Sequence, residues 1–408
     1  MANKKIFIFN PENDMALAFG GDFYTPPPLP AMLRHDLKLL PIWMADTDDA
    51  VMADNVPAQW IRQTATQING VCTNIVARQD IRHADYSFSP WGWSPSLRRE
   101  LVAAGANDSS LPSRDRIEQI RELSHRRSSI IIHNAVNQAI GYQLAPTPVE
   151  LHSFEAVRQF AAANPGCFLK APWSSSGKGI FRAVDADALA LERWCNGVLR
   201  RQGSILAEKP LDSLLDFAME FKIDNGKASF VGYSVFANNS QSSFSSCIIG
   251  SESHLESLIV DVLGDAKLLS NVRNALSPIL EKLIGSCYSG FLGIDMMVYT
   301  HNGTPQLCPC IEINLRCTMG VVAAIISSRF VAPGTTGSFH VDFFKTSAEL
   351  KAHCQALAAQ NPAKIAHGRM ESGFFELTPF ESTSQYIAYL ILHKERQTLS
   401  NTALLLYL

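Results

Sequence analysis

Two strand-like runs around a short polar turn, within residues 290–316, constrain the fold of this chain more than any other feature. The second run ends in Ile-Glu-Ile-Asn-Leu-Arg, residues 311–316. Side chains alternate between the two faces of a β-strand, so the apolar half of this run is expected to pack on a core. Glu312, Asn314 and Arg316 then share the opposite face. We therefore predict an antiparallel hairpin with one polar face.

The register of this hairpin follows from the length of its turn. A loop over the four residues after His301 places His301 opposite Gln306. Counting outward along both strands then brings Asp295 directly opposite Glu312. Pro309 cannot donate a ladder hydrogen bond, so the second strand is an edge strand at this point or begins one residue later.

Opposed carboxylates repel each other, and a bridging divalent cation removes the repulsion. The oxygen atoms of Asp295, Glu312 and Asn314 suit Mg²⁺, which binds through one or two carboxylates, waters and substrate phosphates. These three residues are the predicted metal ligands. Arg316 lies two residues further on, where a guanidinium can hold a phosphate or a substrate carboxylate. The alternative is a solvated polar face whose alternation arose by chance.

A lysine followed by a Ser/Gly loop, residues 170–179, suggests phosphate binding. The loop is not a Walker A motif, because Gly179 follows Lys178 where that motif requires Ser or Thr. Its first glycine is also missing, since that position is Pro172. Glycine-rich loops turn backbone N–H groups toward anions, so the residues alone indicate a phosphate site of unassigned class.

Composition excludes several classes of protein. The 408 residues are 47% hydrophobic and 18% charged with a net charge of −3, which predicts a folded protein of two or three lobes. No bulk nucleic acid or anionic membrane partner is expected at this charge, and a homodimer is compatible with it. No run approaches the roughly 18 apolar residues of a membrane span. The short apolar run near the N-terminus is read as a buried strand rather than a signal peptide. The nine cysteines have no zinc-type spacing, which predicts reduced thiols and a cytoplasmic protein.

The first ~110 residues alternate short apolar runs with helical stretches, which favours a small α/β layer with a largely parallel sheet. The predicted strands lie at residues 5–9, 37–43, 70–77 and 85–91. Ligands of such sheets bind beyond the carboxyl ends of strands, so the segments that follow the first and the last of these strands form a candidate substrate edge.

The segment after the first predicted strand carries Asn10, Glu12, Asn13 and Asp14. These side chains serve either in substrate binding or, at Asn13 or Asp14, as a helix N-cap. The segment after the last predicted strand carries Trp91 and Trp93, which form either a stacking wall or part of the core.

The rest of the chain has clear element boundaries. Ser113 and Ser153 are expected to cap helices, and Asn225-Gly226 is the strongest short hairpin turn in the chain. Predicted helices span residues 110–128, 153–166, 187–203 and 270–286, and predicted strands span 167–173, 204–211 and the hairpin 218–236. The tail at 371–392 suggests a strand and a final helix. Glu220 and Lys222 are either near a ligand or an exposed pair on the hairpin.

Four motifs in order make the chain resemble the ATP-grasp superfamily. They are KAPWSSSGKGI, LAEKPLD, MEFKID and EINLR, within residues 170–316. The second is similar to the hinge of the biotin carboxylase type, and the resemblance covers roughly residues 113–330. It implies an α/β protein with an N-terminal Rossmann-like pre-ATP-grasp domain (1–112), a small ATP-grasp lobe (113–204) and a large lobe with a C-terminal extension (205–408).

The resemblance implies roles for residues of the nucleotide site. Lys170 would reach the α- and β-phosphates. Glu208 would mark the hinge at the adenine, whose edge would be read by backbone groups of Lys209 and Leu211. Arg126 would contact a phosphate, with Arg127 as second candidate. The loop expected to close over the phosphates consists of Ser174, Ser175, Ser176, Gly177, Lys178 and Gly179.

The resemblance also implies a reaction. Asp295, Glu312 and Asn314 would hold magnesium, and Arg316 would contact the transferred phosphate or an acyl phosphate. The expected activity is an ADP-forming ligase that activates a carboxylate with ATP and joins it to an amine, with Arg316 and Lys170 as catalytic groups. A small-molecule kinase on the same scaffold and an ATP-binding protein without turnover stay open. The opposed carboxylates argue against the last, and nothing in the sequence names the substrates.

Overall fold

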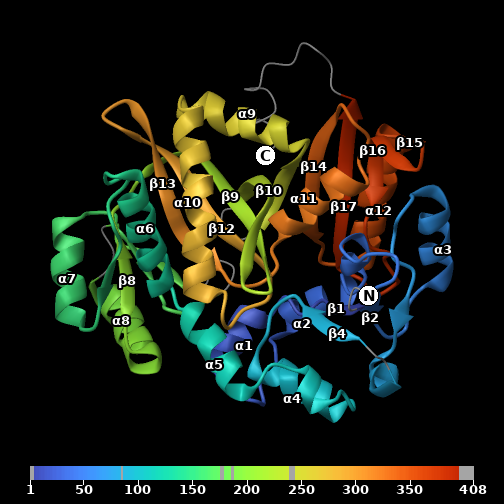
Figure 1. The fold of residues 1–408 in the computed structure, drawn as a ribbon, viewed down its shortest axis with the longest axis horizontal. Coiled ribbons are helices and arrows are strands. Elements are labelled where there is room, and N and C mark those ends of the chain that lie inside the picture. The colour runs from blue at the N-terminus through green and yellow to red at the C-terminus, as the bar shows by residue number, and fades with distance from the viewer. Residues whose placement is uncertain (1–3, 84–85, 175–178, 185–187, 239–243, 395–408) are drawn as a thin grey trace.

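The computed structural model describes residues 4–83, 86–174, 179–184, 188–238 and 244–394, whose strands form three sheets. Figure 1 shows α7, α8 and β8 at one end of the molecule and β16 and α12 near the other, with β9, β10 and β12 between them. The sheets follow one another in the sequence, and the domain boundaries after residues 112 and 204 stay a prediction.

The N-terminal sheet is parallel, with strand order β3-β2-β1-β4. Strand order reverses between β1 and β4, so the segments after these two strands lie at the position where such sheets bind ligands. The elements are β1 (Lys5–Ile8), α1 (Asn13–Phe19), α2 (Pro28–Asp36), the 3₁₀ helix η1 (Leu40–Trp43), β2 (Ala50–Met52), α3 (Ala58–Gln67), β3 (Ile75–Val76), η2 (Arg78–His83), β4 (Ser87–Pro90), α4 (Pro95–Ala103) and η3 (Asp108–Ser110).

The strand predicted at residues 37–43 is wrong. This segment ends in η1, and the strand beside β1 is β2. Leu40, Ile42 and Trp43 are all fully buried, and an apolar run buried on every side has no periodicity that separates a strand from a helical turn. Trp43 donates its indole N–H to the carbonyl of Leu377 at 2.6 Å, so the segment docks on the C-terminal part of the chain.

The second sheet is antiparallel with order β5-β8-β6-β7. Ser113 and Ser153 cap α5 and α7 as predicted, each accepting a backbone N–H of the first turn. The helix predicted over residues 110–128 ends early, and a second helix follows after a short turn. The elements are α5 (Arg114–Leu123), α6 (Arg127–Ile140), β5 (Val149–Leu151), α7 (Phe154–Ala163), β6 (Phe168–Lys170), β7 (Ile180–Arg182), α8 (Ala188–Gln202) and β8 (Ile205–Glu208).

The third sheet has nine antiparallel strands in the order β13-β12-β9-β10-β11-β14-β17-β16-β15. The predicted turn at Asn225-Gly226 joins β9 to β10, with both residues at positive φ. The elements are β9 (Asp212–Asp224), β10 (Lys227–Asn238), β11 (Phe244–Ile249), α9 (Glu252–Leu263), α10 (Ala266–Ile284), β12 (Gly290–His301), β13 (Thr304–Asn314), α11 (Met319–Arg329), β14 (Thr335–Phe343), α12 (Ser347–Gln360), β15 (Lys364–Ala366), β16 (Arg369–Glu376) and β17 (Tyr386–Lys394).

The final helix predicted within residues 371–392 is wrong, because this segment forms β16 and β17. β17 lies between β14 and β16, and its aromatic and branched side chains suit a strand with neighbours on both sides. Leu390 belongs to the same buried cluster as Phe7 of β1 and Val321 of α11. The C-terminal strands therefore share a core with the N-terminal sheet.

The turn between β12 and β13 is shorter than predicted. It consists of Asn302 and Gly303 at φ +51° and +76°, the conformation that two-residue hairpin turns require. His301 consequently pairs with Thr304 rather than with Gln306.

The predicted opposition of Asp295 and Glu312 is nevertheless confirmed. The register shifts between Met297, which pairs with Cys308, and Asp295, so that β13 carries extra residues at this point. Pro309 is among these extra residues. β13 is an edge strand, which confirms the first of the two alternatives for Pro309, an edge strand rather than a strand that begins one residue later. The irregularity compensates for the shorter turn.

All nine cysteines are free and buried. Across the part of the chain that the structure covers, no helix combines the length and apolar character needed to cross a bilayer.

Candidate active site

The paired carboxylates of β12 and β13 form the centre of the candidate site. Burial and the neighbouring Glu312 carboxylate raise the pKa of Asp295 to about 7. Burial alone would also raise the pKa of Glu312, but Arg126 and Lys170 outweigh it and lower that pKa. Asn314 donates its amide to Asp295 at 3.0 Å. The site thus holds one ionised carboxylate beside one that releases its proton near neutral pH.

Arg126 connects these carboxylates to the segment that follows β6. One terminal nitrogen donates to the Ala171 carbonyl at 2.7 Å and to the Ser174 hydroxyl at 2.6 Å. The other donates to a Glu312 oxygen at 3.0 Å. Its Nε is buried without a partner. The second candidate, Arg127, is half-exposed and lies 3.9 Å from Glu122 instead.

Lys170 lies buried at the end of β6 and forms an ion pair with Glu208, the last residue of β8, at 2.7 Å. The other Glu208 oxygen is buried without a partner. Lys209 is exposed, whereas Leu211 packs against the cluster around Tyr299. The predicted phosphate lysine and the predicted hinge glutamate are therefore in direct contact.

The predicted phosphate loop is described only at its two ends. The Ala171 N–H donates to the Gly179 carbonyl at 2.8 Å and closes the base of the loop. A Cβ on Gly179 would lie 2.2 Å from the Ser174 Cβ, so no other residue fits there without a shift. Ser175, Ser176, Gly177 and Lys178 lie outside the described residues.

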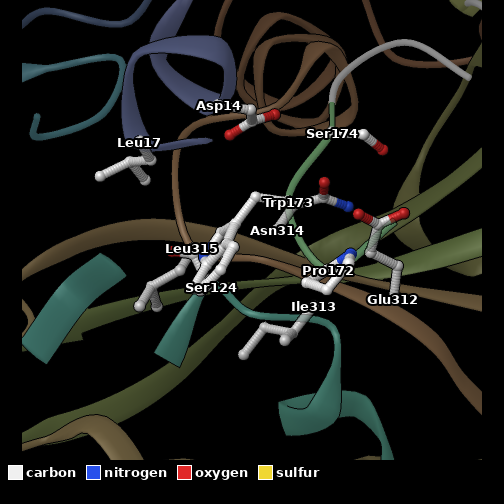
Figure 2. A pocket seen from close by; sticks show the side chains of 10 residues that line it. All are labelled: Asp14, Leu17, Ser124, Pro172, Trp173, Ser174, Glu312, Ile313, Asn314 and Leu315. Carbon is white, nitrogen blue, oxygen red and sulfur yellow. The ribbon is translucent and has the colours of Figure 1, made fainter. Parts of the chain in front are cut away.

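An open cleft lies between the start of α1, the segment after β6 and the end of β13. Figure 2 shows Asp14 and Ser174 on one side of it, with Asn314 and Glu312 facing them. The lining residues are Asp14, Leu17, Ser124, Pro172, Trp173, Ser174, Glu312, Ile313, Asn314 and Leu315.

Arg316 joins the N-terminal layer to this cleft. Its Nε donates to an Asp14 oxygen at 2.7 Å, and a terminal nitrogen donates to the Asn314 amide oxygen at 3.1 Å. Asp14 stands in the first turn of α1 without capping it, because the N-cap position is Glu12 and no side chain caps there. The helix-cap interpretation of Asn13 and Asp14 is therefore wrong. The sequence placed Asp14 at a substrate edge but gave no indication of its pairing with Arg316.

The two asparagines after β1, Asn10 and Asn13, have structural partners. Asn10 donates to the Gly92 carbonyl at 2.8 Å, and with its amide suitably oriented Asn13 donates to the same carbonyl at 3.0 Å. Both asparagines are buried. Trp91 and Trp93 are also buried, so the packing alternative holds and no stacking wall is presented. These contacts fasten the ends of β1 and β4 together.

Glu220 of β9 was not predicted as a core residue, yet it is 1% exposed. Its two oxygens accept the hydroxyl groups of Ser234 at 2.8 Å and Thr318 at 3.0 Å. A Cβ on Gly320 would come within 2.1 Å of Glu220, so a glycine makes room for the carboxyl group. Burial, with a contribution from Asp295, raises the pKa of Glu220 to about 8. The exposed-pair interpretation of Glu220 and Lys222 is therefore wrong for Glu220.

Replacing Glu220 by glutamine should change how stability depends on pH. The side chain ionises near pH 4.5 in the unfolded chain and near 8 in the folded protein. Between these values the unfolded state loses the proton that the folded state keeps, so this residue makes the wild type less stable as pH rises. Glu220→Gln has no such proton. Its melting temperature relative to wild type should rise by at least a few degrees between about pH 5 and about pH 8. A difference that stays constant with pH would contradict a protonated Glu220.

The whole arrangement resembles solved structures over nearly the entire chain. A biotin carboxylase–β-γ-ATP complex from Campylobacter jejuni is 12% identical with a TM-score of 0.53, over 97% of this chain and 88% of that one. N5-carboxyaminoimidazole synthetase from Staphylococcus aureus is 10% identical with a TM-score of 0.50, over 96% and 94%. No protein-family model and no curated protein matches the sequence. The chain has the ATP-grasp fold, as the motifs predicted.

The donor set suits a nucleotide and a divalent cation. Two opposed carboxylates and an amide are hard oxygen donors, the type that Mg²⁺ prefers. Within the described residues no cluster of three His, Cys, Asp or Glu side chains competes with them as a metal centre. The unpartnered Arg126 Nε and Glu208 oxygen are polar atoms that a ligand can satisfy.

Proposed function

We propose that this protein is an ADP-forming ligase that activates a substrate carboxylate with ATP and joins it to an amine. One observation carries the proposal. Glu312 lies opposite Asp295 on the hairpin, accepts a hydrogen bond from the buried cation Arg126 and has its pKa lowered by Arg126 and by the buried Lys170. Together with Asp14 of the N-terminal layer, Glu312 lines one cleft.

The reaction has two steps. A carboxylate oxygen of the substrate attacks the γ-phosphorus of ATP, the bond to the β-phosphate oxygen breaks, and ADP leaves. The amine then attacks the acyl carbon, phosphate leaves with the bonding electron pair, and the nitrogen loses a proton. Both steps develop charge on phosphate oxygens, so catalysis depends on positioning and on neutralising that charge.

The position of each residue suggests its role in the proposed reaction. Lys170 and Arg126 neutralise the phosphate chain, and Arg316 orients the transferred phosphate. Asp295, Glu312 and Asn314 hold Mg²⁺, which supplies further neutralisation when bound. Asp14 sets the direction of the Arg316 guanidinium, because it accepts the Nε–H at 2.7 Å. Catalysis needs no covalent nucleophile on the protein.

A screen of small carboxylates and amines for ADP release from MgATP tests the proposal. An ADP signal that requires both a carboxylate and an amine, with an amide as product, is the expected result. A stable phosphorylated product without any amine requirement would identify a kinase instead. ATP binding without turnover for any pair in the panel would favour a nucleotide-binding protein.

A further inference from the structure

We infer that Arg126 is a phosphate-binding residue shared between the segment after β6 and the metal carboxylate Glu312, so that nucleotide phosphates and Glu312 compete for one guanidinium. This inference rests on the proposed function, because it requires a nucleotide in the cleft. Its consequence is that Mg²⁺ and nucleotide bind cooperatively through the pair of Arg126 and Glu312.

The position of Arg126 between two sheets supports the inference. Its backbone N–H donates to the Pro172 carbonyl at 3.0 Å, which fixes the start of α6 against the segment after β6. From there the side chain reaches Ala171 and Ser174 in the same segment and Glu312 on β13. It is 4% exposed, so it has little room to adopt another arrangement while these partners stay in place.

The partners of Arg126 differ in charge, and this difference indicates which of them a nucleotide phosphate can replace. The Ala171 carbonyl and the Ser174 hydroxyl are neutral and belong to the loop base, whereas Glu312 carries the charge that neutralises the guanidinium. A phosphate that approaches Arg126 meets the Glu312 carboxylate beside it, and like charges repel. A divalent cation held by Glu312 removes this repulsion and releases Arg126 to the phosphate.

Neighbouring groups supply matched controls. Asp295 lies opposite Glu312, but its side-chain hydrogen bond comes from Asn314 and not from Arg126. Removing the Asp295 charge therefore removes a metal ligand and leaves the pair of Arg126 and Glu312 intact. Coupling between two ligands is reciprocal, so it can be measured from the nucleotide side alone.

Calorimetric titration with ADP, in EDTA and in millimolar Mg²⁺, tests the inference on the full chain. For Glu312→Gln we expect metal-free ADP to bind about ten-fold tighter than to wild type, because the competing charge is gone. Mg²⁺ should then add little to ADP affinity. For Asp295→Asn the Mg²⁺ effect should also fall, but metal-free affinity should stay near that of wild type.

The possible outcomes separate this inference from the proposed function. If metal-free ADP binds equally tightly to wild type and Glu312→Gln, the competition at Arg126 is overturned and the proposed function is not. The same holds if Asp295→Asn gains as much metal-free ADP affinity as Glu312→Gln. Failure of wild type to bind ADP even with Mg²⁺ would overturn both. Loss of amine-dependent turnover in the screen leaves this binding test unaffected. Thermal melting checks that each variant folds. If Glu312→Gln does not fold, Glu312→Ala serves as the second variant.

Discussion

Glu312→Gln is expected to reduce ADP release from MgATP by roughly a hundred-fold or more while leaving the fold intact. Arg126 and Lys170 lower the pKa of Glu312, so glutamine removes the carboxylate of the opposed pair that is the more readily ionised, and with it one proposed metal ligand. The fold should survive, because Arg126 keeps its bonds to Ala171 and Ser174 and an amide oxygen can still accept from it. Steady-state ADP release and circular dichroism on the same sample measure both parts.

An exposed glutamate supplies the control for this substitution. Glu155 lies in the first turn of α7, on the surface and in a pair with Arg158. Glu155→Gln removes the same charge by the same chemical change and should leave ADP release unchanged. Near-normal activity in Glu312→Gln would show that the metal assignment on β12 and β13 is wrong.

Lys170→Ala is expected to weaken MgADP binding by roughly ten- to hundred-fold, the usual value of a hydrogen bond to a charged group. Lys170 is held at the end of β6 by its 2.7 Å ion pair with Glu208, so its ammonium group occupies a fixed position, close enough to Glu312 to lower the pKa of that carboxylate. The substitution also leaves the Glu208 carboxylate buried and unpaired. Removing one partner of a buried ion pair costs about 3–5 kcal/mol, so a clear loss of thermal stability should accompany the loss of affinity.

Lys209→Ala is the matched control for Lys170→Ala. Lys209 is an exposed lysine one residue beyond Glu208, and only its backbone is expected near the adenine. Its removal should change neither affinity nor melting temperature. Unchanged MgADP affinity in Lys170→Ala would refute the placement of the phosphates at this end of the cleft.

Local rules of sequence were enough to predict much of the fold. Ser113 and Ser153 cap helices because a serine hydroxyl satisfies a free N–H of the first turn wherever it stands at that position. The Asn225-Gly226 turn likewise depends only on two residues that tolerate positive φ. Asn302-Gly303 has the same property, but the predicted turn was a longer loop, so the predicted pairing of His301 with Gln306 was wrong. The irregularity at Pro309 offsets this shift, and Asp295 still lies opposite Glu312.

These local rules could not predict contacts between residues that are far apart in the sequence. Arg316 and Asp14 are 302 positions apart, and Arg126 and Glu312 are 186 apart. Each of these charged residues suits either solvent or a ligand when only its neighbours in sequence are known. The fold alone decides that the members of each pair meet, and that Asp14 and Glu312 line the same cleft. Glu220 differs in kind, because its burial depends on the space that distant glycines leave for its carboxyl group.

Titration of the wild-type protein with ATP in millimolar Mg²⁺ tests the central claim most directly. Saturable binding of one ATP per chain is expected, with affinity that falls in EDTA and falls again in Lys170→Ala. No detectable binding up to millimolar ATP would contradict the claim that Lys170, Arg126, Asp295 and Glu312 form a nucleotide and metal site.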